Sequence, residues 1–251
     1  FRSLAGHTFV GGISGTLPGH PDNAFLIWRN PTNMALMGGY QATSGGGSNP
    51  GTRDSTLYPT VLKRTVGSVR VLSMLGATNC TVEKVTFREG LNTVAGANIA
   101  NGTGTYLTNC WSVTFADCVI AGNTNSQSCG GTGMGLTRSS VVLTNCTIAD
   151  NYGSNERSQG DGLYVDGSSR ATMIRSFILR NKGNNAGGNG NTGAGFYNDG
   201  VLDLIETVVS GNEALNTANS AQVGGGANNG TLTMRNCLVT SNRCWAGTSA
   251  N

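Results

Sequence analysis

Charged residues are scarce in this chain. Only 12% of its 251 residues are Asp, Glu, Lys or Arg, which is about half of the usual share. The net charge is +3, and the basic residues form no run. A nucleic-acid partner is therefore not expected, because such partners are bound by clustered Lys and Arg.

Long apolar runs and histidines are also lacking. No stretch reaches the roughly 20 apolar residues of a membrane-spanning helix, so no membrane span is expected in this segment. The only imidazoles are those of His7 and His20, and spacings such as Cys110 to Cys118 match no common zinc pattern. The sequence therefore predicts neither a metal site nor a cofactor.

Glycine, with 39 residues, and asparagine, with 28, are abundant and surround one spacing that occurs six times. An apolar residue is followed by a small residue at +3, an apolar residue at +5, and Asn or Gly at +8. Position 0 holds Val82, Phe115, Leu143, Met173, Leu204 and Met234. Position +3 holds Val85, Cys118, Cys146, Ser176, Thr207 and Cys237. Position +5 holds Phe87, Ile120, Ile148, Ile178, Val209 and Val239. Successive copies start 33, 28, 30, 31 and 30 residues apart, which indicates stacked units that cannot bury their apolar faces alone.

The residues of each copy favour strands. Val, Ile, Phe, Leu and Thr suit a half-buried pleated surface, and positions +3 and +5 share one face of a strand. The step from 0 to +3 breaks the alternation and indicates a bend or bulge. A helix also fits that step, but the flanking Gly and Asn would be costly in a helix interior. Position +2 is polar and faces water: Lys84, Asp117, Asn145, Arg175, Glu206 and Asn236.

A second short motif precedes four of the copies and adds another strand to each unit. Its members are Gly135-Leu136-Thr137, Gly162-Leu163-Tyr164, Gly195-Phe196-Tyr197 and Gly226-Ala227-Asn228. We therefore expect an all-β fold, a right-handed parallel β-helix with coils of about 30 residues. One domain covers the chain, with irregular first coils over residues 1–72, regular coils over 73–242 and a tail over 243–251.

The Asn at position +8 has a structural role in such a fold. Equivalent residues of stacked coils lie about 4.8 Å apart, so their amides can form a ladder. Asn also tolerates the left-handed conformation of a corner. Solvated turn residues are the alternative. The ladder would contain Asn123, Asn151, Asn181, Asn212 and Asn242.

The cysteine count is seven, so at least one thiol stays free or pairs between chains. The cysteines at position +3 are interpreted as small core residues. The others fall outside that position and are the disulfide candidates: Cys80, Cys110, Cys129 and Cys244.

Residues 34–90 carry a resemblance to a known kind of protein. The order is MALMGGY at 34–40, Arg53, a strand at 60–62 and VEKVTFREG at 82–90. It resembles the bacterial right-handed β-helix surface proteins called choice-of-anchor Q, and more distantly the polymorphic outer-membrane proteins, within the pectate-lyase-like superfamily. Residues 143–151 and 193–198 are similar to repeats of that family. The resemblance implies an extracellular or bacterial cell-surface protein, structural or adhesive, and hardly specifies chemistry.

An enzyme is the competing hypothesis, because many parallel β-helices act on polysaccharides. Hydrolysis needs two carboxylates roughly 5 to 9.5 Å apart, and the eight Asp include no Asp-Asp pair. A lyase would need an acidic calcium cluster beside a basic residue. Position +2 offers only a row of mixed charge, so we expect no catalytic residue.

Glycan binding without catalysis is the intermediate hypothesis. The second motif places Tyr164 under Tyr197 in adjacent coils, flanked by Thr137 and Asn228. This aromatic stack could hold a sugar ring, but stabilising rungs are the simpler explanation.

Four Asn-X-Thr sequons occur, and two of them are expected in strands, at Asn79 and Asn145. Asn101 and Asn229 are the accessible candidates for glycosylation.

The two ends of a β-helix expose strand edges that favour further pairing. The chain begins Phe-Arg-Ser, without an initiator Met or a signal peptide, and has no capping helix at either end. Two explanations remain: the chain continues in a longer solenoid, or copies join head to tail as a homo-oligomer. Phe1, Phe9 and Trp245 are the candidate anchors of that assembly.

Overall fold

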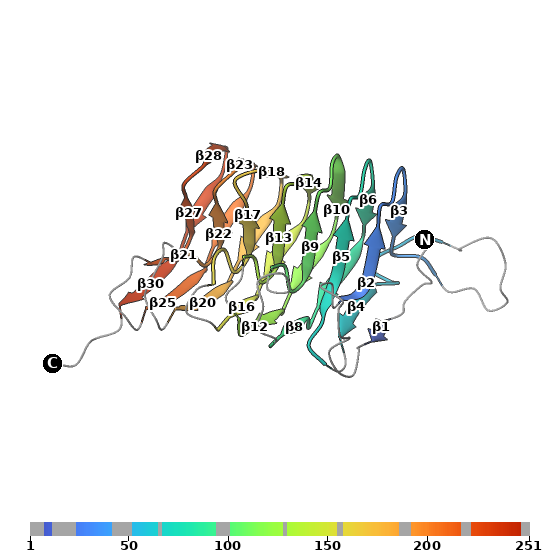
Figure 1. Ribbon diagram of the computed structural model, residues 1–251, viewed down its shortest axis with the longest axis horizontal. Coiled ribbons are helices and arrows are strands. Elements are labelled where there is room, and N and C mark those ends of the chain that lie inside the picture. The colour runs from blue at the N-terminus through green and yellow to red at the C-terminus, as the bar shows by residue number, and fades with distance from the viewer. Residues whose placement is uncertain are drawn as a thin grey trace.

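The computed structural model describes residues 8–11, 24–41, 52–64, 67–93, 101–127, 130–154, 158–185, 192–216 and 222–246. These residues form short strands that stack along one axis, as Figure 1 shows. Every strand-to-strand pairing is parallel. The all-β fold with coils of about 30 residues is therefore confirmed.

Each regular coil contributes one strand to each of four sheets, which we number in the order that the chain visits them. Sheet 1 contains β2 (Ala24–Arg29), β5 (Arg70–Leu75), β9 (Thr105–Thr108), β13 (Met134–Thr137), β17 (Leu163–Val165), β22 (Phe196–Asn198) and β27 (Gly226–Asn228). Sheet 2 contains β3 (Ala35–Met37), β6 (Thr81–Glu83), β10 (Val113–Ala116), β14 (Ser140–Thr144), β18 (Arg170–Ile174), β23 (Val201–Ile205) and β28 (Thr231–Arg235).

The other two sheets complete the coil. Sheet 3 contains β1 (Thr8–Gly11), β4 (Thr60–Arg64), β7 (Val85–Arg88), β11 (Val119–Ala121), β15 (Thr147–Ala149), β19 (Phe177–Leu179), β24 (Val208–Ser210) and β29 (Leu238–Thr240). Sheet 4 contains β8 (Leu91–Asn92), β12 (Thr124–Asn125), β16 (Tyr152–Gly153), β20 (Lys182–Asn185), β25 (Glu213–Asn216) and β30 (Arg243–Ala246). A small fifth sheet pairs β21 (Thr192–Gly193) with β26 (Gln222–Val223).

The six-fold repeat sets the core. Position 0 forms one column in sheet 2, where Phe115 pairs with Val82 below and Leu143 above. Position +5 forms one column in sheet 3, where Ile148 pairs with Ile120 and Ile178. Both columns are fully buried from Val82 to Val209. The predicted inward register is therefore confirmed for these coils.

The break between positions 0 and +3 is a corner between two sheets. The residue at +2 has a φ between 47° and 55° in all six copies, which turns the chain from sheet 2 into sheet 3. Five of the six lie on the surface as exposed residues, and Lys84 is half-buried. The expected bend is therefore a left-handed corner, and no bulged strand is needed to explain it.

The asparagines at +8 form a continuous ladder. The side-chain Nδ2 of each donates to the Oδ1 of the next, from Asn123 to Asn242, at 2.9, 2.9, 3.0 and 2.9 Å. Their expected left-handed conformation is wrong, because the positive φ belongs to the residue before, as at Gly122 and Asp150. The Asn itself must turn its side chain into the coil to reach the next amide.

Two other expectations need correction. The second motif was misaligned in its first and last copies: Gly135 pairs with Tyr164, two residues from the predicted partner, and Gly226 pairs with Phe196, one residue from it. Glycine occurs at every second position from Gly131 to Gly135, so the sequence alone does not show which of these residues aligns with the glycine of the next coil. The tail over 243–251 contains β30, which continues sheet 4 beside β25.

Candidate functional site on the outer face of sheet 1

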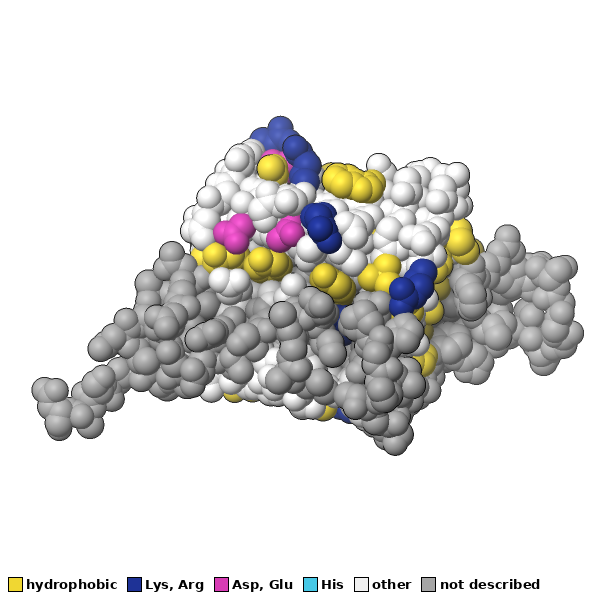
Figure 2. All heavy atoms as spheres, in the orientation of Figure 1, with side chains coloured by type: hydrophobic (Ala, Val, Ile, Leu, Met, Phe, Trp, Pro, Cys, Tyr) yellow, Lys and Arg dark blue, Asp and Glu magenta, His cyan; other side chains and the backbone are white. Residues whose placement is uncertain are grey.

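The outer face of sheet 1 gathers the polar and aromatic residues that offer most chemistry. One row runs through Tyr106, Gly135, Tyr164, Tyr197 and Ala227, which are strand partners in consecutive coils. Figure 2 shows acidic and basic side chains beside each other on this side of the molecule, above a band of hydrophobic ones. This face is therefore the first place to look for binding or catalysis.

Tyr164 and Tyr197 stack on each other, as the sequence indicated. Their ring centroids are 5.8 Å apart and the rings are inclined by 13°. The neighbours differ from those expected: Gly135 and Ala227 flank the pair, because Thr137 and Asn228 belong to other rows.

The stack has little open surface for a sugar. Gly130 packs against the Tyr164 ring so closely that a Cβ there would lie 2.5 Å from it, and Tyr197 is only 6% exposed. One face of each ring is used by the other ring. The pair therefore fits a stabilising role better than a sugar platform.

Two carboxylates lie beside the tyrosines in adjacent coils. Asp166 directly follows β17 and Asp199 directly follows β22, and the backbone N–H of Asp199 donates to the carbonyl of Val165. Equivalent residues of paired strands are about 4.8 Å apart. Sequence reasoning missed this pair, although the predicted register of Tyr164 under Tyr197 also places Asp166 under Asp199, two residues further on.

Both carboxylates hold turns together. Asp166 accepts hydrogen bonds from the backbone N–H of Arg138 at 3.1 Å, from that of Ser168 at 3.1 Å and from Ser169 Oγ. Asp199 Oδ1 accepts from Asn229 Nδ2 at 3.0 Å. Asp166 therefore stabilises its own turn and joins it to the preceding coil, and Asp199 joins its coil to the next one.

The adjacent phenols are weak acids in this setting. Burial, together with the negative charges of Asp199 and Asp166, raises the pKa of Tyr164 to about 12. Burial, followed by the charge of Asp199, also raises the pKa of Tyr197. Both phenols stay protonated at neutral pH, so they can donate hydrogen bonds but cannot act as bases.

A buried arginine at the start of this face was also missed. Arg70 stacks over the Tyr106 ring at 4.6 Å from its centroid, and its Nε donates to the carbonyl of Asn101 at 2.8 Å. Burial of an arginine requires such partners. Arg70 thereby fixes the chain entering β9.

A second buried ionisable side chain lies between sheets 4 and 1. Asp161 is 1% exposed, and Thr132 Oγ1 donates to its Oδ1 at 3.1 Å. Gly153 and Gly183 leave the space that its carboxyl fills, since a Cβ at either would lie 1.8 or 2.4 Å from a carboxyl oxygen. Burial raises the pKa of Asp161 to about 8, so the group is uncharged below that pH.

The mixed-charge row at position +2 is a ladder of contacts between coils. Asn145 Nδ2 donates to Asp117 Oδ1 at 3.2 Å, and Arg175 Nε donates to Asn145 Oδ1 at 3.3 Å. A further pair, Arg180 and Asp150, joins two coils through two hydrogen bonds of 2.8 Å. These charges serve to link the coils.

The cysteines donate hydrogen bonds at corners. Cys146 Sγ donates to the carbonyls of Phe115 and Thr144, both at 3.4 Å, and Ser176 makes the same two contacts one coil later, at 3.4 and 2.9 Å. Position +3 therefore favours a small residue with a donor. Cys80 and Cys110 do the same at the corner between sheets 1 and 2.

The disulfide expectation is wrong for three of its four members. Cys80, Cys110 and Cys244 are free thiols, as are Cys118, Cys146 and Cys237. The inward Cys80 and Cys110 face backbone carbonyls, which explains their positions without a partner sulfur. Cys129 lies outside the described residues.

The sequons are arranged differently from the expectation. Asn79 and Asn145 have φ of 52° and 53° and are exposed corner residues outside the strands. Asn101 is half-buried, and its Oδ1 accepts a hydrogen bond from the backbone N–H of Gly130. Asn229 Nδ2, the atom that would carry a glycan, donates to Tyr197 Oη at 2.7 Å and to Asp199.

Of the proposed assembly anchors, only one can be placed by its side chain. Trp245 is 51% exposed in β30. Phe9 lies in β1 in the register column of Leu62, and its side chain is outside the described part of the structure. Phe1 lies outside the described residues.

Parallel coils closed by an inward Asn ladder define a β-helix solenoid. The chain belongs to the family described as the right-handed β-helix region, which matches residues 70–251. No curated protein sequence matches the chain significantly.

The described residues contain no cluster of three or more His, Cys, Asp or Glu side chains that could hold a metal ion. Over the same part of the chain, no helix is long and apolar enough to cross a membrane.

Proposed function

We propose that the protein is a non-enzymatic scaffold, a structural or adhesive rod on the outside of a bacterial cell. The observation that carries the proposal is the use of outward polar side chains to link one coil to the next. The resemblance to choice-of-anchor Q and polymorphic outer-membrane proteins supports the same location and role.

The cross-coil contacts recur on several faces. Besides Asp150 and Arg180, pairs join Arg170 with Asp203 and Lys182 with Glu213. A single exposed pair contributes about 0–1 kcal/mol, but each also keeps neighbouring coils in register. A rod needs such repeated lateral contacts along its length.

A glycan-degrading protein is the second candidate, and one observation favours it. Asp166 and Asp199 are carboxylates that follow paired strands in adjacent coils, and retaining glycosidases also use two neighbouring carboxylates. The hydrogen bonds of Asp166 to Arg138 and Ser169 and of Asp199 Oδ1 to Asn229 argue for the scaffold, because they give each carboxylate a structural role.

Product release from a broad panel of polysaccharides separates the two candidates. We expect the chain to release no oligosaccharide, and the Asp166→Asn and Asp199→Asn variants to behave identically. Asp203→Asn is the matched control, since Asp203 pairs with Arg170 on sheet 2. Release that disappears in the first two variants and persists in the control would replace the scaffold with the enzyme.

A further inference from the structure

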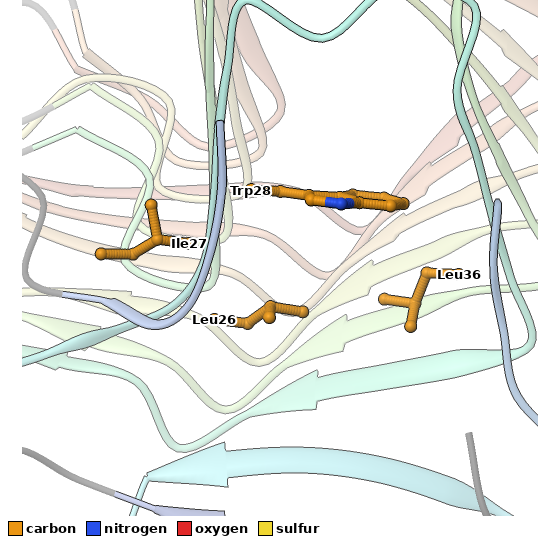
Figure 3. A pocket seen from close by; sticks show the side chains of 4 residues that line it. All are labelled: Leu26, Ile27, Trp28 and Leu36. Carbon is orange, nitrogen blue, oxygen red and sulfur yellow. The ribbon is translucent and has the colours of Figure 1, made fainter. Parts of the chain in front are cut away.

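One hollow of the structure belongs to its core. It has a volume of about 70 Å³ and is lined by Leu26, Ile27, Trp28 and Leu36. Figure 3 shows Leu26, Trp28 and Leu36 around one space, with Ile27 directed away from it. Leu26 and Trp28 pack against the buried core. This hollow is therefore part of the interior packing.

A wider hollow opens on the outer face of sheet 3. Its volume is about 280 Å³, and it extends over three successive coils. Val119, Ala121 and Gly122 of the middle coil line it, between Arg88 of the coil before and Asp150 of the coil after. A Cβ at Gly122 would meet nothing within 4 Å. The small side chains of one coil therefore leave a depression in the outer face of the sheet.

Two coils further along, the same rows carry large side chains. Phe177 lies in the row of Val119 and is 41% exposed. Leu179 lies in the row of Ala121. The outer face of sheet 3 therefore has a depression at β11 and a protrusion at β19, and β15 lies midway between them.

A two-fold axis along β15 would bring each protrusion against a depression of a second copy. Rotation about the strand direction turns the face over and reverses the order of the coils, so β11 of one copy faces β19 of the other. Each of five facing pairs then joins a large side chain to a smaller residue: Phe177 to Val119, Leu179 to Ala121, Arg180 to Gly122, Arg88 to Ser210 and Glu89 to Gly211. Thr147 and Ala149 lie on the axis and face their own counterparts. Alternation of large and small residues lets two packed faces interdigitate.

The charges at position +2 are complementary under the same rotation. Along successive coils this row reads Lys84, Asp117, Asn145, Arg175 and Glu206, and all except the half-buried Lys84 are exposed. Reversal of the order sets Lys84 of one copy against Glu206 of the other. It also sets Asp117 against Arg175, and Asn145 against its own counterpart. Opposite charges thus face each other along this edge, which favours one orientation and one register.

The opposite edge of the face is compatible with that orientation. Asp150 lies on the axis beside its counterpart, but it holds Arg180 of its own copy through two hydrogen bonds of 2.8 Å, which offsets the repulsion between the two acids. An axis parallel to the solenoid would instead set Arg175 against Arg180 and Phe177 against Leu179. That orientation brings like charges and protruding side chains together, so the antiparallel orientation is favoured.

We propose that the outer face of sheet 3 binds a second copy of this chain, with the two solenoids side by side and antiparallel. The contact is isologous, because both copies use the same surface around a two-fold axis at β15. Seven strands, from β4 to β29, take part. At about 4.8 Å per strand and five residues in width, they cover roughly 34 by 17 Å, or about 600 Å², on each copy.

That area lies at the lower end of specific interfaces, so the association depends on concentration. The inference goes beyond the proposed scaffold function and does not depend on it.

Sedimentation equilibrium of the full chain tests the association. We expect a monomer–dimer equilibrium whose mean mass approaches twice 25.8 kDa as concentration rises. Phe177→Glu replaces the protruding ring with a charge and should raise the dissociation constant of the dimer at least tenfold. Trp111→Glu is the matched control, because Trp111 is a 53% exposed aromatic residue just before β10 of sheet 2, and it should leave the constant unchanged. Equal effects of the two variants, or a wild type that stays monomeric at high concentration, would overturn the proposal.

A charge exchange tests the register. Asp117→Arg sets two arginines against each other in the dimer, and Arg175→Asp sets two aspartates against each other. Each variant alone should therefore dimerise roughly tenfold more weakly than the wild type. An equal mixture of the two variants should recover the wild-type affinity, because every arginine at these positions then faces an aspartate of the other chain. Circular dichroism establishes that both variants are folded, and a mixture of folded variants that associates no better than either alone would contradict the antiparallel pairing.

Discussion

The side-chain amide of Asn151 donates to Asn181 Oδ1 at 2.9 Å, and its backbone N–H donates to the same oxygen at 3.2 Å. The same Nδ2 also donates a hydrogen bond to the carbonyl of Ile120, at 3.2 Å. Asn151 Oδ1 in turn accepts from Asn123. One buried side chain thus satisfies polar groups of three successive coils.

Loss of that amide is therefore expected to destabilise the solenoid. Asn151→Ala leaves several buried donors and acceptors without partners, each at about 1–3 kcal/mol, so we expect a total loss of roughly 3–5 kcal/mol. Urea denaturation followed by circular dichroism measures it. Asn145→Ala, at an exposed corner, is the control; equal losses in the two variants would show that the ladder contributes little.

A charge in the inward column of sheet 3 should be equally harmful. Ile148→Asp buries an unpaired carboxylate between Ile120 and Ile178, at an expected cost of several kcal/mol. Thr147→Asp changes the neighbouring outward residue and should cost well under half as much. Thermal melts compare them, and unchanged stability of Ile148→Asp would contradict the register.

Because the thiols donate hydrogen bonds at corners, we expect serine to replace them at a lower cost in stability than valine. Cys146→Ser keeps a donor for the carbonyls of Phe115 and Thr144 and should change stability by less than about 1 kcal/mol, whereas Cys146→Val removes it and should cost about 1–3 kcal/mol. Alkylation under denaturing, non-reducing conditions should modify all six described cysteines. Fewer modified thiols would mean that disulfides form.

The raised pKa of Asp161 leads us to expect that the fold loses stability as pH rises. Its carboxyl ionises near 3.8 when unperturbed, but in the fold burial raises its pKa to about 8. The unfolded chain therefore loses the proton first, and the stabilisation present below about pH 4 is lost progressively until about pH 8.

Asp161→Asn removes this titration and keeps an acceptor for Thr132. The variant should be more stable than the wild type by a few kcal/mol at pH 8, and the difference should shrink toward pH 4. Urea unfolding across this range measures it. A difference that is independent of pH would rule out a buried, titrating carboxyl.

The sequence predicts the columns of sheets 2 and 3 well, because the distances from 0 to +3, +5 and +8 are the same in every copy. The sequence does not predict the strand register where the loop lengths differ between coils. The register of sheet 1 depends on the segment between the Asn and the next Gly, so the partners of Gly135 and Gly226 were misaligned. The corner contacts of Cys80 and Cys110 were missed because they depend on which carbonyls a turn leaves unpaired.

We propose that the polar residues of sheet 1 hold coils together and perform no chemistry. The unfolding free energy of Asp166→Ala tests it most directly. If the carboxylate clamps its turn through Arg138, Ser168 and Ser169, the variant should lose about 1–3 kcal/mol. Catalytic groups are often held at a cost to stability, so their removal commonly leaves a protein as stable or more stable. A variant as stable as the wild type, or more stable, would contradict the scaffold account.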